Sequence, residues 1–308
     1  MPSHLHLGIN TCFAVKRWPE PERWISIVTD DLGLHVCQFS LDQIDPLLDE
    51  SATSAYASSV RQRAAEAGLR IHSAFTGLAA YSWSQLLHPE PSARLAARRW
   101  YERAIDLAAG LGAGGAGGHL GAFSVRDAAD QARRRLLLDE LAGHLGTLSS
   151  RAAARGLSFL LFENMAVPRE YGHTIEEAHA LIELVPNAPV PLTLCYDVGH
   201  PCALKTGTRS DDYLAWLTEP WPRTPIIHLQ QTDRSGDHHW PFAPAYNAIG
   251  VVDPDATLRA LAAWPAGQDI YLFLEVIHPF EADDEEVLDD LRSSVRYWRE
   301  AMARAGLA

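Results

Sequence analysis

Eight short apolar runs, each followed by a longer helical pattern, constrain the fold of this 308-residue chain more than any other feature. The runs lie at residues 6–10, 35–40, 70–75, 114–119, 158–164, 192–197, 226–231 and 271–276. The segments between them carry apolar residues at three- and four-residue spacing, most clearly at 91–113 and 130–156, which is typical of amphipathic helices. A last helix is expected at 283–305. Strict alternation of strand and helix indicates parallel strands that are joined by right-handed crossovers.

The number of these units favours one architecture. Eight units over about 250 to 300 residues fit a (β/α)8 TIM barrel, in which helices surround an eight-stranded parallel barrel. We therefore expect a single TIM-barrel domain over residues 1–308, with the active site at the C-terminal ends of the strands. A doubly wound open sheet is the alternative, but no GxGxxG motif follows the first apolar run. The glycine-rich stretch at 112–118 stands where the fourth strand is required.

Composition and charge limit the kinds of partner that the protein is expected to bind and where it is expected to be located. The net charge of −13 argues against a non-specific grip on nucleic acid, which needs many Lys and Arg side chains on phosphates. No apolar stretch approaches the ~20 residues that span a bilayer, and the N-terminal MPSHLHLGIN lacks the pattern of a signal peptide. The four cysteines form no CxxC pair, so we expect buried thiols in a reducing cytoplasm. Whether the protein forms a homo-oligomer is left open by the sequence.

Ionisable residues interrupt the apolar pattern where strands five to eight end. Glu163, Asp197, His228 and Glu275 hold these positions, and the C-terminal strand ends of a TIM barrel converge on one pocket. Burying three carboxylates without a cation would be very costly. Carboxylate oxygens with one imidazole suit a single divalent ion, with Mn²⁺, Mg²⁺ or Co²⁺ preferred and Zn²⁺ as the alternative.

Four short motifs carry a resemblance to a known family. FEN at 162–164, DVGH at 197–200, HLQQTD at 228–233 and FLEV at 273–276 resemble the xylose-isomerase-like TIM barrels, which include sugar isomerases, ketose 3-epimerases and endonuclease IV nucleases. In the ketose 3-epimerases, Glu, Asp, His and Glu from strands five to eight hold one divalent ion. The resemblance implies that role for Glu163, Asp197, His228 and Glu275. It also implies that Glu163 and Glu275 exchange a proton with opposite faces of the substrate.

The resemblance also implies substrate contacts. His200, three residues after Asp197, would touch a substrate hydroxyl, and Arg234 would lie near the substrate and a catalytic carboxylate. The other predicted substrate-binding residues are His72, His119, His239 and Lys205. Further candidate cations are Lys16, Arg17 and Arg209, and the candidate pocket walls are Trp18, Phe75, Trp83 and Trp240. One departure stands out, because many ketose 3-epimerases carry a Glu where this chain has Arg169, with Glu170 next to it.

These patterns predict a metal-dependent isomerase or epimerase that acts on a small ketose or ketose phosphate through an enediolate. The long segment at 232–252 resembles a loop of a subgroup that acts on short charged sugars, including tetrulose phosphates. Three alternatives stay open. A metal-dependent decarboxylase of a 3-oxo sugar acid, of the 3-oxo-isoapionate type, would use the same chemistry. The others are an endonuclease IV-like multi-zinc phosphoesterase, for which His72, His119, His200 and the DHH element at 237–239 are available, and a non-catalytic sugar-binding protein.

Overall fold

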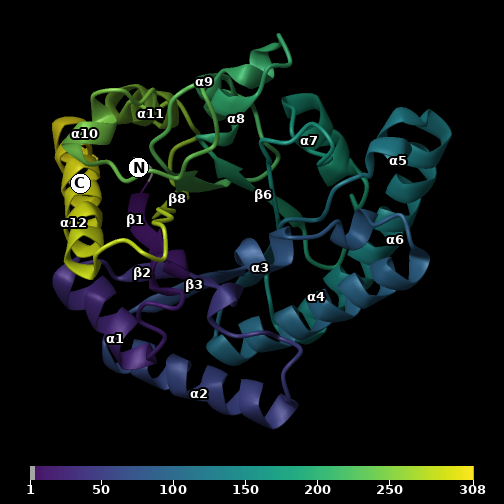
Figure 1. Ribbon diagram of the computed structural model, residues 1–308, viewed down its shortest axis with the longest axis horizontal. Helices are drawn as coiled ribbons and strands as arrows, with labels where there is room; N and C mark the ends of the chain where they lie inside the picture. The colour runs from purple at the N-terminus through teal and green to yellow at the C-terminus, as the bar shows by residue number, and fades with distance from the viewer. Residues whose placement is uncertain (1–3, 308) are drawn as a thin grey trace.

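Eight parallel strands close into a barrel, and helices surround it in sequence order (Figure 1). The computed structural model describes residues 4–307. Met1, Pro2 and Ser3, where the segment examined for a signal peptide begins, and Ala308 lie outside the described residues. The strands are β1 (His4–Asn10), β2 (Val36–Ser40), β3 (Arg70–Phe75), β4 (Gly115–Gly118), β5 (Phe159–Glu163), β6 (Leu192–Asp197), β7 (Ile226–Leu229) and β8 (Asp269–Leu274). All eight predicted strands are present, so the predicted (β/α)8 fold is confirmed.

The helices vary in length, and the three that the sequence predicted, α4, α6 and α12, are the longest, with 21, 24 and 21 residues. The α-helices are α1 (Pro21–Ser26), α2 (Glu50–Glu66), α3 (Gly77–Tyr81), α4 (Pro91–Leu111), α5 (Val125–Ala129), α6 (Gln131–Ala154), α7 (Ile175–Glu183), α8 (His200–Ala203), α9 (Tyr213–Leu217), α10 (Pro244–Asn247), α11 (Pro254–Leu261) and α12 (Asp284–Arg304). Short 3-10 or π turns are η1 (Thr11–Ala14), η2 (Ile27–Asp31), η3 (Leu41–Gln43), η4 (Gln85–Leu87) and η5 (Arg209–Asp211). Asp130 caps α6 by accepting hydrogen bonds from the Ala132 and Arg133 N–H groups, which explains where that helix begins.

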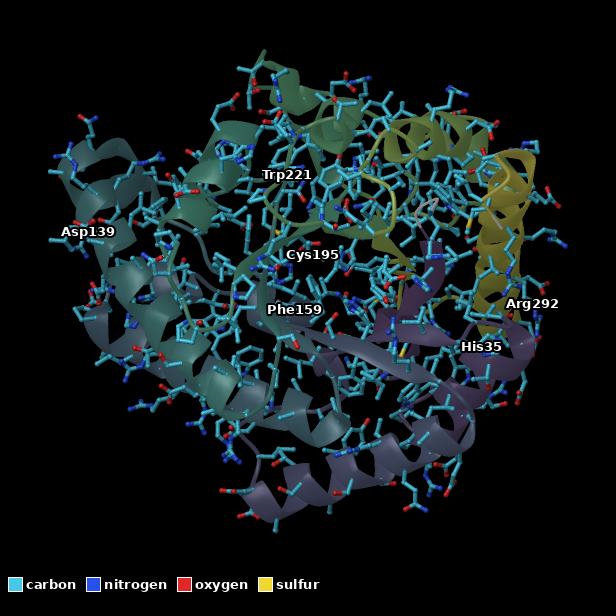
Figure 2. The ribbon with its side chains drawn as sticks, turned by 180° about the vertical axis from the view of Figure 1, so that it is seen from behind. His35, Asp139, Phe159, Cys195, Trp221 and Arg292 are labelled. Atoms are coloured by element: carbon cyan, nitrogen blue, oxygen red, sulfur yellow. The ribbon has the colours of Figure 1, made fainter. Side chains whose placement is uncertain are left out.

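The core has an inner and an outer layer. Side chains of one small cluster fill the barrel interior: Val36, Phe75, Leu161, Cys195, Ile226 and Phe273. Their neighbours along the strands, such as Leu160 and Phe162, belong to the larger cluster between the strands and the helices because successive strand residues face opposite sides. Figure 2 shows Phe159 and Cys195 on central strands, whereas Asp139 and Arg292 lie on outer helices.

The glycine-rich fourth strand reflects a close approach between strands. Gly117 has a φ angle of +145°, and a Cβ atom there would lie 2.2 Å from the carbonyl oxygen of Leu161. Only glycine accommodates both the backbone angle and the contact. The segment that approaches β4 so closely is the neighbouring strand β5.

Two long connections lie at the carboxyl ends of their strands and shape the site. Residues 76–92 follow β3 and contain α3 and η4, while residues 232–252 follow β7 and contain α10. The second connection is tied back to β7 because Gln231 and Trp240 exchange two backbone hydrogen bonds of 2.8 and 2.9 Å. No helix within residues 4–307 has the length and apolar character needed to cross a bilayer.

Candidate active site

Four side chains converge at the carboxyl ends of β5 to β8. Glu163 and Asp197 end their strands, His228 lies within β7, and Glu275 directly follows β8. The ligand atoms of these residues all lie within 4.8 Å of one another. Each residue is at most 4% exposed. The structure therefore brings together the whole predicted metal-ligand set in one buried group.

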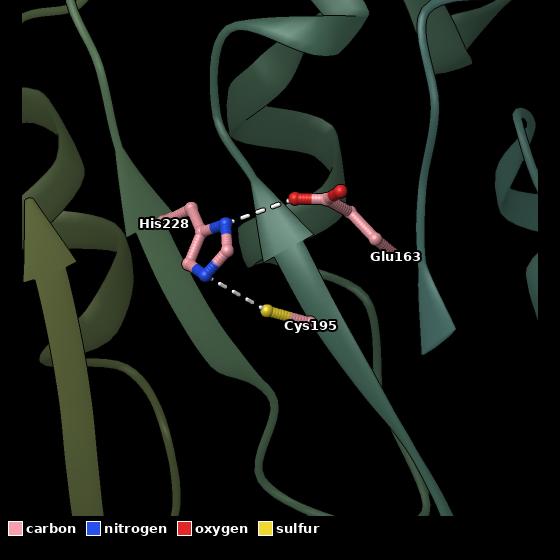
Figure 3. Close-up of side chains that lie close together, drawn as sticks. All are labelled: Glu163, Cys195 and His228. Carbon is pink, nitrogen blue, oxygen red and sulfur yellow. Dashed lines mark hydrogen bonds and ion pairs between the residues drawn. The ribbon is translucent and has the colours of Figure 1, made fainter. Parts of the chain in front are cut away.

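The imidazole of His228 links this group. Its Nδ1 lies 2.9 Å from Glu163 Oε1 and 2.8 Å from Glu275 Oε2. Its Nε2 faces the other way, 3.2 Å from the Sγ of Cys195, so Glu163 and Cys195 lie on opposite sides of the ring (Figure 3). Burial by itself would lower the pKa of His228, but the neighbouring Cys195, Glu275 and Glu163 groups raise it well above its usual value.

Asp197 has one carboxylate oxygen that is fully used and one that is not. Its Oδ1 accepts hydrogen bonds from the Gly199 N–H at 2.7 Å, the His200 N–H at 3.1 Å and the Gln230 amide at 2.9 Å. Its Oδ2 is buried and has no hydrogen-bond partner within residues 4–307. A buried carboxylate oxygen without a partner is energetically unfavourable. Three carboxylates, one imidazole and this free oxygen fit a divalent cation well.

The two glutamates are held by different neighbours. Glu163 Oε2 lies 3.1 Å from His119 Nε2. Burial would raise the pKa of Glu163, but its hydrogen bonds with His119 and His228 prevail and hold it well below its usual value. Glu275 Oε1 accepts a 3.4 Å hydrogen bond from the Asn10 amide, and its Oε2 lies 3.6 Å from His239 Nδ1.

Three polar residues that position the site were missed from the sequence. The Asn164 amide bonds both the N–H and the carbonyl oxygen of Asp197, at 2.8 and 3.1 Å, and so fixes the end of β6 against β5. Gln38 Oε1 accepts from the Asn10 amide at 2.7 Å and lies 2.6 Å from His228 Nε2. The sequence signal for Asn10 and Gln38 was a polar residue within each of the apolar runs that form β1 and β2.

Three of the predicted substrate-binding histidines lie around one cavity. His119, His200 and His239 line a space of about 280 Å³ together with Glu163 and Glu275. His119 Nδ1 lies 3.0 Å from the Thr76 hydroxyl, and His200 Nδ1 lies 2.5 Å from the carbonyl oxygen of Asn164. These contacts leave the Nε2 atom of His119 directed at Glu163.

Asp237 connects His200 and His239. Its two oxygens lie 3.3 Å from His200 Nε2 and 3.4 Å from His239 Nε2. Burial would lower the pKa of His239, but Asp237 and Glu275 raise it to about 10. His239 has a φ angle of +50°, a left-handed conformation that is uncommon outside glycine. Asp197, His200 and His239 also form a second group whose ligand atoms lie within 4.8 Å of one another.

His72 lies away from this cavity, contrary to the prediction that it binds substrate. The pairing of β2 with β3 shifts by one residue at this point, so His72 is the extra residue of a bulge. Its ring lies 4.2 Å from that of Tyr271 and 5.5 Å from that of Phe159, near the amino ends of β8 and β5. Burial, followed by the charge of Arg70, lowers the pKa of His72 to about 3, so it packs as a neutral ring.

Arg234 and Lys205 are also absent from the described residues that line the cavity. Both are exposed on loops, and Arg234 lies near Cys202 and Asp211. Of the predicted aromatic walls, Phe75 lines the cavity. Trp18 is buried in the outer core, Trp83 is exposed, and Trp240 stacks on His238 with ring centroids 4.0 Å apart.

The structure shows where a carboxyl group lies near Arg169, the position at which many ketose 3-epimerases carry a Glu. Arg169 is exposed, whereas Glu170 is buried and interacts with the hydroxyl of Tyr81, a residue that lines the cavity. Burial raises the pKa of Glu170 to about 7. A carboxyl group is therefore present at the rim of the site, supplied one position further along the chain.

Comparisons with known proteins agree with the fold. Residues 29–304 match the family described as xylose isomerase-like TIM barrel. The chain is 29% identical over 300 residues to D-erythrulose 1-phosphate 3-epimerase of Brucella abortus (strain 2308), covering 96% of this chain and 95% of that protein.

Solved structures share the fold of this chain. A candidate xylose isomerase from Rhodospirillum rubrum has a TM-score of 0.90 and 32% identity, covering 96% of this chain and 99% of that one. An L-ribulose 3-epimerase has a TM-score of 0.70 at 18% identity, covering 100% of this chain and 95% of that one, which shows a common fold. Since the family match spans most of the sequence and the predicted resemblance is confirmed, this protein belongs to the xylose isomerase-like TIM barrel family.

Proposed function

We infer that this protein is an enzyme that epimerises or isomerises a short ketose phosphate, such as a tetrulose phosphate, by moving a proton next to the carbonyl group. The observation that carries this proposal is the buried group of Glu163, Asp197, His228 and Glu275, with ligand atoms within 4.8 Å and a free Oδ2 on Asp197. The relative that is named a D-erythrulose 1-phosphate 3-epimerase supports the reaction class and the substrate size.

Glu163, Asp197, His228 and Glu275 are the residues that would hold the divalent ion. When bound, such an ion supplies Lewis acidity, which makes the C–H bond beside a carbonyl easier to ionise. Glu163 reaches the cavity from the end of β5 and Glu275 from the residue after β8. The proposal places them on opposite faces of a bound ketose. One carboxylate removes the proton as a general base, and the other returns a proton to the opposite face.

Neighbouring side chains prepare these two carboxylates. His119 holds Glu163 at Oε2, and His239 faces Glu275 Oε2, so each glutamate keeps a fixed direction. Apolar side chains of Phe75, Met165 and Ile277 line the same cavity. They exclude water from the reacting carbon, which strengthens electrostatic interactions within the site.

The proposal is tested by incubating the enzyme with tetruloses and tetrulose phosphates in D2O, with Mn²⁺ or Mg²⁺ supplied. An epimerase or isomerase incorporates deuterium at the carbon next to the carbonyl and releases no CO2. Release of CO2 from a 3-oxo sugar acid without such exchange would favour the decarboxylase. Binding of a ketose with no exchange at all would favour a sugar-binding protein.

A phosphoesterase with several ions is a second candidate, supported by the second group of Asp197, His200 and His239. Asp237 bridges the two histidines and would offer a further oxygen ligand in such a site. Elemental analysis separates the candidates: the isomerase proposal expects one ion per active chain, while hydrolysis of a phosphodiester with two or three ions bound would support the phosphoesterase.

A further inference from the structure

The active-site cavity opens beside a second, larger cavity. The second space has a volume of about 530 Å³ and lies between η1, the start of α3 and the segment after β8. Cys12, Asp42, Leu78 and Ile277 line both spaces. A ligand that occupies the first cavity can therefore extend one end into the second.

The first cavity is poorly suited to a phosphate group. None of the described residues that line it is Lys or Arg, and its charged lining includes the carboxylates of Asp42, Glu163, Asp237 and Glu275. The histidines of the lining are already paired with carboxylates: His119 with Glu163, His200 and His239 with Asp237, and His238 with Asp233. A phosphate dianion added to these paired groups would be repelled by the carboxylates. A phosphorylated ketose needs a cation elsewhere within reach.

The second cavity supplies two cations, and one of them is already engaged. Arg17 pairs with Asp284 and donates hydrogen bonds to the carbonyl oxygens of Ala282 at 2.7 Å and Pro279 at 3.0 Å. Its side chain is only 8% exposed. Arg17 therefore holds the segment after β8 in place, which leaves it little capacity for a ligand.

Lys16 is the cation that remains available. It is exposed, lines the second cavity, and forms no ion pair or side-chain hydrogen bond with any residue in 4–307. Its Nζ lies 4.6 Å from the centre of the Phe280 ring, and that residue is 53% exposed. An ammonium group over a ring face keeps its N–H donors free for an anion.

The backbone of Lys16 is also unusual. Its φ angle is +62°, one of three positive values among the non-glycine residues of the described chain. Such conformations carry strain and concentrate at functional sites. The choice of lysine is notable as well, since the chain has 2 lysines and 24 arginines.

We propose that Lys16 binds the phosphate group of the ketose phosphate substrate in the second cavity and so determines the preference for phosphorylated over unphosphorylated ketoses. This assignment rests on the proposed function, because it places the reacting carbons beside Glu163 and Glu275. The nearby carboxylate of Asp42 is partly compensated, since its oxygens accept hydrogen bonds from the Leu78 and Ala79 N–H groups at 2.7 and 2.8 Å. A compact ammonium suits a phosphate as a point charge.

The two lysines allow a test on the unaltered protein. Acetylation with an N-hydroxysuccinimide ester is followed by mass spectrometry of the peptides that contain Lys16 and Lys205. A tetrulose phosphate at ten times its dissociation constant should slow labelling of Lys16 about tenfold, because about a tenth of the sites stay free. Lys205 serves as the internal control and should label at an unchanged rate.

Other ligands in the same assay decide what Lys16 recognises. The unphosphorylated tetrulose should leave the labelling of Lys16 unchanged, and inorganic phosphate should slow it more weakly than the ester. Equal slowing by the unphosphorylated sugar, or by a four-carbon sugar acid, would overturn the assignment to phosphate. Unchanged labelling of Lys16 with the tetrulose phosphate at saturation would overturn the binding role itself.

Kinetics give an independent reading. Lys16→Gln should lower kcat/KM for the phosphorylated ketose about 10- to 100-fold, mainly through KM, and Lys16→Arg should restore part of the loss. Lys205→Gln is the matched control and should keep the ratio of phosphorylated to unphosphorylated turnover. A wild-type ratio in Lys16→Gln contradicts the inference. If the wild-type enzyme exchanges protons with no short ketose, the proposed function fails instead, and the labelling assay still reports on phosphate binding.

Discussion

Gln38 Oε1 lies 2.6 Å from Nε2 of His228, on the side of the ring that faces away from Glu163 and Glu275. This contact joins β2 to β7 across the barrel interior. It places a hydrogen-bond acceptor beside Nε2, so with a cation bound among the carboxylates Nε2 would carry the proton and Nδ1 would direct its lone pair at the cation. A partner of this kind fixes the orientation of a ligating histidine and raises its basicity.

We therefore expect Gln38→Leu to weaken binding of Mn²⁺ about 10- to 100-fold, while the fold is retained. Titration of the metal-free protein with Mn²⁺ measures the dissociation constant. Gln62→Leu is the matched control, because Gln62 is exposed on α2 and its side chain hydrogen-bonds Glu66, far from the site in the sequence of elements. Equal Mn²⁺ affinity of wild type and Gln38→Leu would show that the contact plays no part in metal binding.

Gly77→Ala should impair substrate binding through α3. Gly77 has a φ angle of +71°, and an added Cβ would lie 2.4 Å from Asp42 Oδ2, the carboxylate that caps α3. Displacing this cap moves Leu78 and Tyr81, which line the cavity, so we expect KM to rise and stability to fall by about 1–2 kcal/mol.

Gly68→Ala provides the comparison for that variant. Gly68 has a similar φ angle of +67°, yet nothing lies within 4 Å of its added Cβ. It should lose about 1 kcal/mol of stability with unchanged KM. If the two variants show the same KM, the position of α3 does not govern substrate binding.

The pair of Arg94 and Glu140 should contribute to stability in a pH-dependent way. The Arg94 guanidinium is 3% exposed and makes two hydrogen bonds to Glu140, of 2.9 and 2.7 Å. These bonds lower the pKa of Glu140 below its ordinary value of 4.5. The stabilisation is therefore complete above pH 4.5 and is lost as the pH falls through the lower folded-state pKa.

Replacing the Glu140 carboxylate tests both the contribution of the pair to stability and its dependence on pH. Glu140→Gln should lower the free energy of unfolding at pH 7 by about 2 kcal/mol and reduce the acid-dependent part of its decline. Asp289→Asn is the control. Asp289 pairs with Arg292, but its side chain is 74% exposed, so the variant should change stability little. Urea unfolding between pH 3 and pH 7 measures the difference, and equal curves for Glu140→Gln and Asp289→Asn would refute the role of the pair.

Glu170 should give the reaction a pH dependence near neutrality. Burial raises its pKa to about 7, so its carboxyl is neutral below that pH and negatively charged above it. A charge near Tyr81 and Glu163 disfavours an anionic substrate, and we expect kcat/KM to fall as the pH rises through about 7. Glu170→Gln should flatten this fall, whereas Glu176→Gln, at an exposed position of α7, should leave the profile as in wild type.

The sequence predicted the elements whose patterns are periodic and the site residues that those elements position. The helices α4, α6 and α12 follow from apolar periodicity, and the strands follow from short apolar runs, with the glycine-rich β4 placed by the alternation of strand and helix. Glu163, Asp197, His228 and Glu275 could be grouped in advance because barrel strands end at one face. His72 could not be placed correctly, since a one-residue bulge in β3 has no clear signal in the sequence.

Loop residues were harder to place than strand residues. Arg234 and Lys205 lie on connections whose course depends on tertiary contacts, such as the pairing of Gln231 with Trp240. Gln38 and Asn10 were not predicted as site residues. A single polar residue in an apolar strand can be assigned a role only when its hydrogen-bond partner across the barrel is known. Glu170 supplies a carboxyl group one residue after Arg169, within a loop.

Titration of the metal-free protein with Mn²⁺, with deuterium exchange into a tetrulose phosphate measured at each step, tests the central claim most directly. We predict that exchange rises in proportion to bound Mn²⁺ and saturates at one ion per chain. We also predict that Asp197→Asn binds Mn²⁺ at least about 100-fold more weakly, and that Glu163→Gln and Glu275→Gln each lose exchange while remaining folded. Full exchange in the metal-free protein, or wild-type exchange in either glutamine variant, would contradict the account.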